Sequence, residues 1–105
     1  MVSKGERIGV IISNDPKKKV VTFVGYGVYE GDELPVGIGG FGDVMKDAGI
    51  TNPKLKLDSG EIAWGCECWW GEEEEVKKII TEYEEDGFTI NTVTMADLRE
   101  SSDDD

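Results

Sequence analysis

The stretch WGCECWWGEEEEVKKIITEYEEDG, residues 64–87, joins a predicted strand to a predicted helix. From Glu72 to Glu85, apolar side chains follow the i, i+3, i+4, i+7 spacing of an amphipathic helix, at Val76, Ile79, Ile80 and Tyr83. Glutamates crowd its first turn, where the helix dipole favours negative charge. This helix therefore needs an apolar surface, and the aromatic stretch before it is the first candidate.

Residues 61–70 are predicted to form one extended strand, in which successive side chains point to opposite faces. One face is then entirely apolar, with Ile62, Trp64, Cys66, Cys68 and Trp70. We expect this face, with both thiols, to be buried against the helix. The other face carries Ala63, Gly65, Glu67 and Trp69. It would place one carboxylate beside one indole, open to a ligand, a partner or solvent.

The Cys66-x-Cys68 pair does not fit a metal or redox site. Structural zinc commonly takes four ligands from two Cys or His pairs, whereas this chain has a single Cys pair and no histidine. A disulfide between the two cysteines would require a departure from extended geometry. We therefore expect free thiols, no metal and no cofactor. Because histidine is also the commonest general base, we assign no catalytic residue and expect a protein that is not an enzyme.

The remaining pattern predicts an α+β fold: a bent antiparallel sheet of four to five strands with one long amphipathic helix packed on a face. Gly25 and Gly27 indicate a bulge, a bend or a close approach of another group. Predicted strands cover residues 7–13, 19–29, 54–57, 61–70 and 88–93, and short helices cover 43–48 and 94–100. Residues 1–100 would form a single domain, followed by a disordered acidic tail over 101–105.

A glycine-rich segment, EGDELPVGIGGFG at residues 30–42, precedes the first short helix. It matches neither GxxxxGK[ST] nor a GxGxxG motif that follows a buried strand, so a phosphate-binding loop is not indicated. Its carboxylates at Glu30, Asp32 and Glu33 suit a hard cation, but their spacing matches no EF-hand. A plain connecting loop and a lid over a ligand both remain open.

The charge of the chain is strongly asymmetric. Its net charge is -12, and residues 61–105 carry fifteen acidic and three basic groups, whereas residues 1–60 carry eight of each. Such a field repels nucleic-acid phosphates and favours basic partners or cations. No apolar run approaches the roughly 20 residues of a membrane-spanning helix. We expect no nucleic-acid partner, no membrane contact and a cytoplasmic location.

Three blocks carry a resemblance: VGYGVYEGDELP at residues 24–35, NPKLKLDSG at 52–60 and WGCECWWGEEEEV at 64–76. With these blocks in this order, residues 7–90 resemble small uncharacterised accessory proteins encoded by phages and bacteria. The resemblance implies a compact cytoplasmic accessory protein, and it makes modulation of a host or defence component plausible. It brings no catalytic residue.

Three functions remain open. The first is a non-enzymatic interaction protein whose acidic C-terminal half binds a basic protein surface. The second is a small-molecule binder of nucleotide type, in which side chains stack on or hydrogen-bond the ligand: Tyr26, Tyr29, Phe41, Glu67 and Trp69. The third and least favoured is a hydrolase whose carboxylates hold a metal. An open sheet edge or the aromatic face is also compatible with a homodimer.

Overall fold

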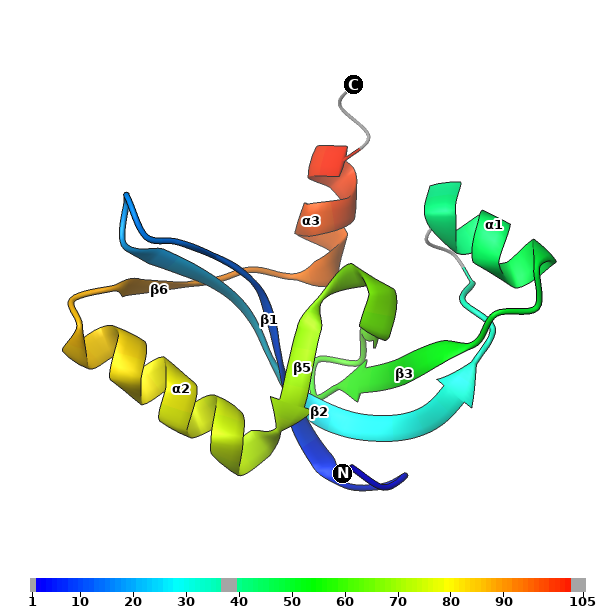
Figure 1. The fold of residues 1–105 in the computed structure, drawn as a ribbon, viewed down its shortest axis with the longest axis horizontal. Coiled ribbons are helices and arrows are strands. Elements are labelled where there is room, and N and C mark those ends of the chain that lie inside the picture. Colours follow the sequence, from blue (N-terminus) through cyan, green and yellow to red (C-terminus); the bar gives the residue numbers. More distant parts are fainter. Residues whose placement is uncertain (1, 37–39, 103–105) are drawn as a thin grey trace.

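The computed structural model of the chain describes residues 2–36 and 40–102, apart from the side chains of Phe41 and of residues 100–102. It confirms an α+β fold in which the helices lie around a single sheet (Figure 1). The elements follow one another as β1 (Arg7–Asp15), β2 (Val20–Glu33), α1 (Gly40–Asp47), β3 (Asn52–Leu57), β4 (Ile62–Trp64), the 3₁₀ turn η1 (Gly65–Glu67), β5 (Trp69–Glu72), α2 (Glu73–Glu85), β6 (Thr89–Thr92) and α3 (Met95–Ser102).

The sheet has six strands in the order β4-β3-β2-β1-β5, with β6 also paired to β2. The prediction of a wholly antiparallel sheet of four to five strands was wrong in two respects. The stretch 61–70 supplies two strands instead of one, and β6 runs parallel to β2 through residues 20–23 and 89–92. The β2 strand is long because β6 pairs with its first part and β3 pairs with residues 27–33.

The glycines of β2 allow the sheet to bend between these two parts. Gly25 has φ +142, a value that side chains rarely adopt, and it pairs with Val10 where the β1–β2 register shifts. A side chain at Gly27 would collide with the backbone carbonyl of Lys56 on β3. Both readings of the glycine pair, a bulge and a close approach, are therefore confirmed.

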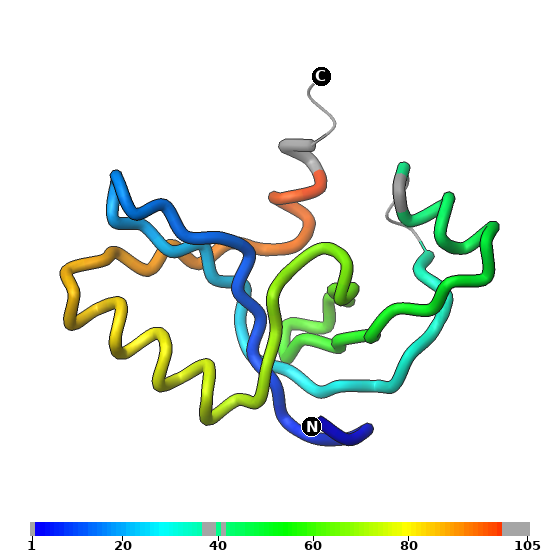
Figure 2. Tube along the Cα trace, in the orientation of Figure 1, coloured from blue at the N-terminus to red at the C-terminus, as the bar shows by residue number. Residues whose placement is uncertain are grey.

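Two apolar clusters lie on opposite faces of the sheet. On one face, α2 packs through fully buried Val76 against Ile11, Val21 and Phe23. On the other face, Ile8 and Val10 meet a second cluster that includes Leu55, Leu57, Ala63 and Met95 of α3. The trace shows α2 and α3 on opposite sides of the β1–β2 hairpin (Figure 2). We call these the α2 face and the α3 face.

The predicted helices are confirmed with shifted ends. α1 begins at Gly40 and is followed by Gly49, whose φ of +74 suits a helix C-terminus. The predicted loop at 30–42 is shorter than expected, because residues 30–33 belong to β2 and 40–42 to α1. Residues 37–39 and 103–105, which include most of the predicted tail, lie outside the described part. Among the described helices, none is long and apolar enough to cross a membrane.

Candidate functional site

The stretch that begins at Trp64 is not one strand. Trp64 ends β4, which pairs with β3, and Trp69 begins β5, which pairs with β1. Between them the 3₁₀ turn redirects the chain, passing so close to β3 that a side chain at Gly65 would come within 2.6 Å of the Pro53 ring. The predicted division of residues 62–70 into two faces was therefore wrong in part: Ala63 is buried in the α3-face cluster with Cys68 and Trp70, whereas Trp69 lies on the opposite face, as predicted.

The two cysteines occupy different surroundings. Both are free thiols, but Cys66 is exposed, contrary to the prediction that it is buried. Cys68 is half-buried, packs with the α3-face cluster, and its Sγ donates a hydrogen bond to the Trp64 carbonyl at 3.4 Å. Burial, helped by the charge of Glu67, raises the pKa of Cys68 to about 12. In the described part of the chain, no three His, Cys, Asp or Glu side chains gather where they would hold a metal.

Glu67 lies on the α3 face, bound to Arg99. Its carboxylate accepts two hydrogen bonds from the Arg99 guanidinium, at 2.7 and 3.1 Å, and one from the Trp64 backbone N–H at 3.1 Å. Arg99 also donates to the Ile62 carbonyl at 2.8 Å. The hydrogen bonds from Arg99 to Glu67 raise the pKa of the guanidinium. Glu67 is therefore a structural carboxylate, and the prediction that it shares a face with Trp69 was wrong.

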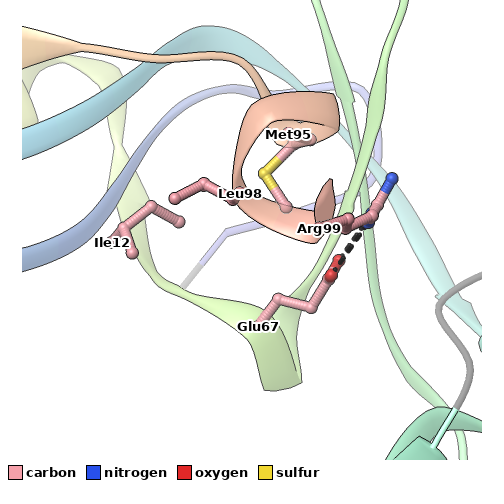
Figure 3. A pocket seen from close by; sticks show the side chains of 5 residues that line it. All are labelled: Ile12, Glu67, Met95, Leu98 and Arg99. Atoms are coloured by element: carbon pink, nitrogen blue, oxygen red, sulfur yellow. Dashed lines mark hydrogen bonds and ion pairs between the residues drawn. The ribbon is translucent and has the colours of Figure 1, made fainter. Parts of the chain in front are cut away.

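A hollow of about 290 Å³ lies beside this ion pair. Figure 3 shows Leu98 of α3 pointing toward Ile12 of β1, with the paired Glu67 and Arg99 at one side. The other walls of the hollow are the apolar side chains of Ile12, Met95 and Leu98. We call this space the α3-side hollow; it is apolar, and the one carboxylate that lines it is already paired.

Trp69 lies on the α2 face, and its side chain is 48% exposed. The indole extends over Gly71, where an added Cβ would stand 3.4 Å from the ring. It lines a hollow of about 390 Å³ with residues from β1 and α2: Ile11, Ile12, Ser13, Asn14, Ile79 and Tyr83. The amide of Asn14 donates to the Tyr83 hydroxyl at 3.0 Å, which fixes one wall.

A second hollow, of about 420 Å³, adjoins the first because both are lined by Ile79 and Tyr83. Glu82 and Asp86 complete its lining. We call the two hollows together the α2 groove. Within the described residues, no cation pairs with the carboxylates of Glu82 or Asp86, and Lys19 reaches only the backbone carbonyl of Asp86, at 3.4 Å. The groove thus combines an aromatic wall with unneutralised acidic groups.

The acidic groups at the start of α2 are used differently. The Glu73 carboxylate forms an ion pair with the Arg7 guanidinium, with an N–O distance of 2.9 Å, and a longer one with the Lys77 ammonium group at 3.6 Å. Glu75, by contrast, forms no ion pair with any described residue, and its carboxylate lies beside Gly71 and the Trp69 indole. Among the described residues, Glu84 and Glu85 of α2 also form no ion pair, so the groove holds only part of the unpaired negative charge of this helix.

The structure does not bring the five predicted site residues together. Tyr26 packs on the α2 face against Phe23, with ring centroids 5.2 Å apart, beneath the ammonium group of Lys77. Tyr29 lies on the α3 face, stacked on Trp70 at 5.3 Å, and its hydroxyl donates to Asp32 at 2.6 Å. The Phe41 side chain lies outside the described part. Of the four whose side chains are described, Trp69 alone lines the α2 groove.

Sequence reasoning missed the other groove residues for an identifiable reason. Ile79 and Tyr83 were assigned wholly to the helix core, yet both are only partly buried and leave one side open to the groove. Glu82 lies between them on the helix and Asp86 just beyond it. A helical projection of residues 73–86 would have shown that Ile79 and Tyr83 lie at the edge of the apolar stripe, next to acidic side chains. That pattern could have indicated a groove with apolar and acidic walls.

Comparison of the chain with protein-family models, with curated proteins and with solved structures found no match.

Proposed function

We propose that the protein is a non-enzymatic binding module that holds a basic segment of a partner protein in the α2 groove. The observation that supports this most is the half-exposed indole of Trp69 in one hollow of the α2 groove, together with the unpaired carboxylates of Glu82 and Asp86 in the other hollow. An accessory role of this kind also agrees with the concentration of negative charge in residues 61–105.

The chemistry of the groove suits lysine and arginine side chains. Their aliphatic stems can lie on apolar surface such as Ile79 while the charged end reaches a carboxylate. An exposed cation over an indole contributes about 0.5–1 kcal/mol, and more when it is desolvated. The acidic field around α2 would also accelerate the approach of a basic partner.

The same geometry gives less support to a small ligand that carries phosphate. Tyr26 and Tyr29 lie on opposite faces of the sheet, so they cannot stack on one nucleobase together with Trp69. The charged side chains that line the α2 groove, Glu82 and Asp86, are carboxylates, which repel phosphate. The basic partner is therefore the function that we put forward.

The test uses a fluorescein-labelled oligo-arginine peptide and measures its affinity by fluorescence anisotropy. The double variant Glu82→Lys/Asp86→Lys should weaken binding by about tenfold or more, because it reverses the charge of the groove. Raising the salt concentration should weaken binding to the native protein, since exposed charges are screened.

The matched control is Asp43→Lys/Asp47→Lys on α1, which changes the net charge equally at exposed positions away from the groove. It should weaken binding by no more than about threefold. Equal losses in the two double variants would show that the peptide responds only to the total charge, and the proposal would then be rejected.

A further inference from the structure

One part of the sheet edge beside the α2 groove has no strand paired with it. β5 pairs with β1 only through Ile8–Ile11, because Trp69, the partner of Ile11, is the first residue of β5 and the chain before it forms the 3₁₀ turn. From Ile12 to Asp15, β1 has β2 on one side, and none of the described strands pairs with the other. Since backbone N–H and C=O groups of a strand point alternately to its two sides, this edge presents unpaired hydrogen-bonding groups.

The two hollows described above lie on either side of this edge. Ile12 lines both of them, with the α2 groove on one face of the sheet and the α3-side hollow on the other. The register between β1 and β2 shifts between Val10 and Ile11 and again between Ile11 and Ser13, so that Ile12 has no partner on β2. Such a bulge re-aims a side chain at a sheet edge, which accounts for the position of Ile12 between the two spaces.

We propose that the basic partner binds by β-strand addition, as an extended segment that pairs with the outer edge of residues 12–15. This inference rests on the proposed function and adds the mode of binding and the pattern of the partner. Successive side chains of an added strand point to opposite faces, so alternate residues enter the α2 groove and the α3-side hollow.

The two hollows select different side chains. The α2 groove, with Trp69 and unpaired Glu82, takes lysine or arginine. The α3-side hollow takes apolar side chains, because Ile12, Met95 and Leu98 form its walls and Glu67 is already paired with Arg99. The partner segment therefore alternates basic and apolar residues.

Charge complementarity decides between this occupant and a second copy of the chain. Two copies that met at this edge would bring two α2 helices and their unpaired carboxylates together. Each copy carries a net charge of -12, so this approach is opposed by repulsion. A basic strand meets attraction at the same place.

The test compares peptides of one composition. The probe is an acetylated and amidated peptide of alternating arginine and valine, and its control carries the same residues as one arginine block and one valine block. The alternating peptide should bind about tenfold or more tightly than the block peptide, because only it matches both hollows. On binding, some backbone amides of residues 12–15 should become protected from hydrogen exchange in NMR spectra.

N-methylation of the alternating peptide tests the backbone hydrogen bonds themselves. Methyl groups on the nitrogens of one alternate set should abolish protection and weaken binding by about tenfold, whereas the other set should have little effect. Both peptide comparisons use the native protein, so loss of folding in a variant cannot confuse them.

The outcomes separate the two proposals. If both peptides bind equally, N-methylation has no effect, and Glu82→Lys/Asp86→Lys still weakens binding, strand addition is overturned while the proposed function stands. If neither peptide binds, both proposals are overturned. If the same amides become protected with rising protein concentration and no peptide, a second copy occupies the edge and strand addition by a partner is rejected.

Discussion

The two faces of the sheet use carboxylates in opposite ways. On the α3 face, Glu61 accepts hydrogen bonds from the backbone N–H groups of Met95 and Ala96, at 3.1 and 3.0 Å, and so caps α3. Glu67 holds Arg99 on the same helix. On the α2 face, Glu82 and Asp86 line the groove without a cation among the described residues. Acidic side chains join elements of the fold in the first region, whereas Glu82 and Asp86 in the second form no ion pair with a described residue.

The tryptophans differ between the regions in the same way. Trp64 is 2% exposed and belongs to the buried core, whereas Trp69 is 48% exposed beside the groove. The comparison indicates that a large apolar side chain stabilises the fold at one position and offers contact area at the other. Four pairs of variants test the comparison between the two faces, and the first pair concerns these tryptophans.

The largest effect is expected at Trp64. Trp64→Ala should lower the free energy of unfolding by about 3–5 kcal/mol, because a buried indole leaves a cavity. Trp69→Ala should lower it by no more than about 1 kcal/mol, since the side chain is half in solvent. Urea denaturation of both variants measures the difference. Equal losses would contradict the division into a closed and an open face.

The next largest effect compares the stability cost of an added methyl group at two places on the α2 face, one where α2 is packed on the sheet and one beside the groove. Gly9 and Gly71 are paired across β1 and β5. A Cβ at Gly9 would stand 2.7 Å from Val76, so Gly9→Ala should cost about 1–3 kcal/mol by forcing α2 outward. At Gly71 the nearest contact is 3.4 Å to the Trp69 ring, and Gly71→Ala should change stability by no more than about 0.5 kcal/mol.

Calorimetric Tm values give this comparison directly. A Gly71→Ala variant as unstable as Gly9→Ala would mean that Trp69 is as firmly packed as Val76.

A smaller effect compares the carboxylates themselves. Glu61→Ala removes the acceptor for two N–H groups at the start of α3 and should cost about 0.5–2 kcal/mol, the range for loss of a helix cap. Glu82→Ala on α2 should remain within about 0.5 kcal/mol of the native protein. Hydrogen exchange of the α3 amides should rise only in the first variant; exchange that is unchanged there would show that α3 is held without this cap.

The smallest effect concerns Arg7, which links the two regions through Asp58 of the β3–β4 turn and Glu73 of α2. Its hydrogen bonds lower the pKa of Asp58. A lowered folded-state pKa stabilises the protein above the usual value of about 4, and this contribution disappears as the pH falls through the folded-state value.

Asp58→Asn should therefore flatten the loss of stability below a pH of about 4, as measured by urea denaturation across the acid range. Arg7→Met should produce the same flattening. A slope as steep as that of the native protein in both variants would show that this pair does not contribute to acid unfolding.

Elements with local signals could be predicted from the sequence. The apolar spacing of residues 76–83 identified α2. Residues 94–100 were predicted as a short helix, and at its start the Thr94 hydroxyl accepts from the Asp97 N–H at 3.0 Å. The predicted strands at 7–13 and 19–29 form the β1–β2 hairpin, where the Asp15 carboxylate accepts from the Lys17 N–H at 3.0 Å. In each case the interacting residues are neighbours in the chain.

The candidate site depends on contacts that are distant in the chain and could not be predicted in that way. The 3₁₀ turn at Gly65 packs against Pro53 of β3, and the Glu67 carboxylate is held by hydrogen bonds from Arg99, 32 residues away in the chain. Strand alternation did predict that Trp69 and Trp70 face opposite sides, as they do within β5. It failed for Glu67 because that residue belongs to the 3₁₀ turn and not to a strand.

The pairing of the central hairpin also has a kinetic consequence. β1 and β2 lie next to each other in the chain, but β5 and β6, which pair along their outer edges, come from residues 69–72 and 89–92. The hairpin therefore emerges first during synthesis and waits with both edges bare. Long-range pairing of this kind limits folding to about milliseconds to seconds. The lysines at positions 17–19 lie at the tip of the hairpin, and lysine is one of the residues that discourage pairing between exposed strand edges.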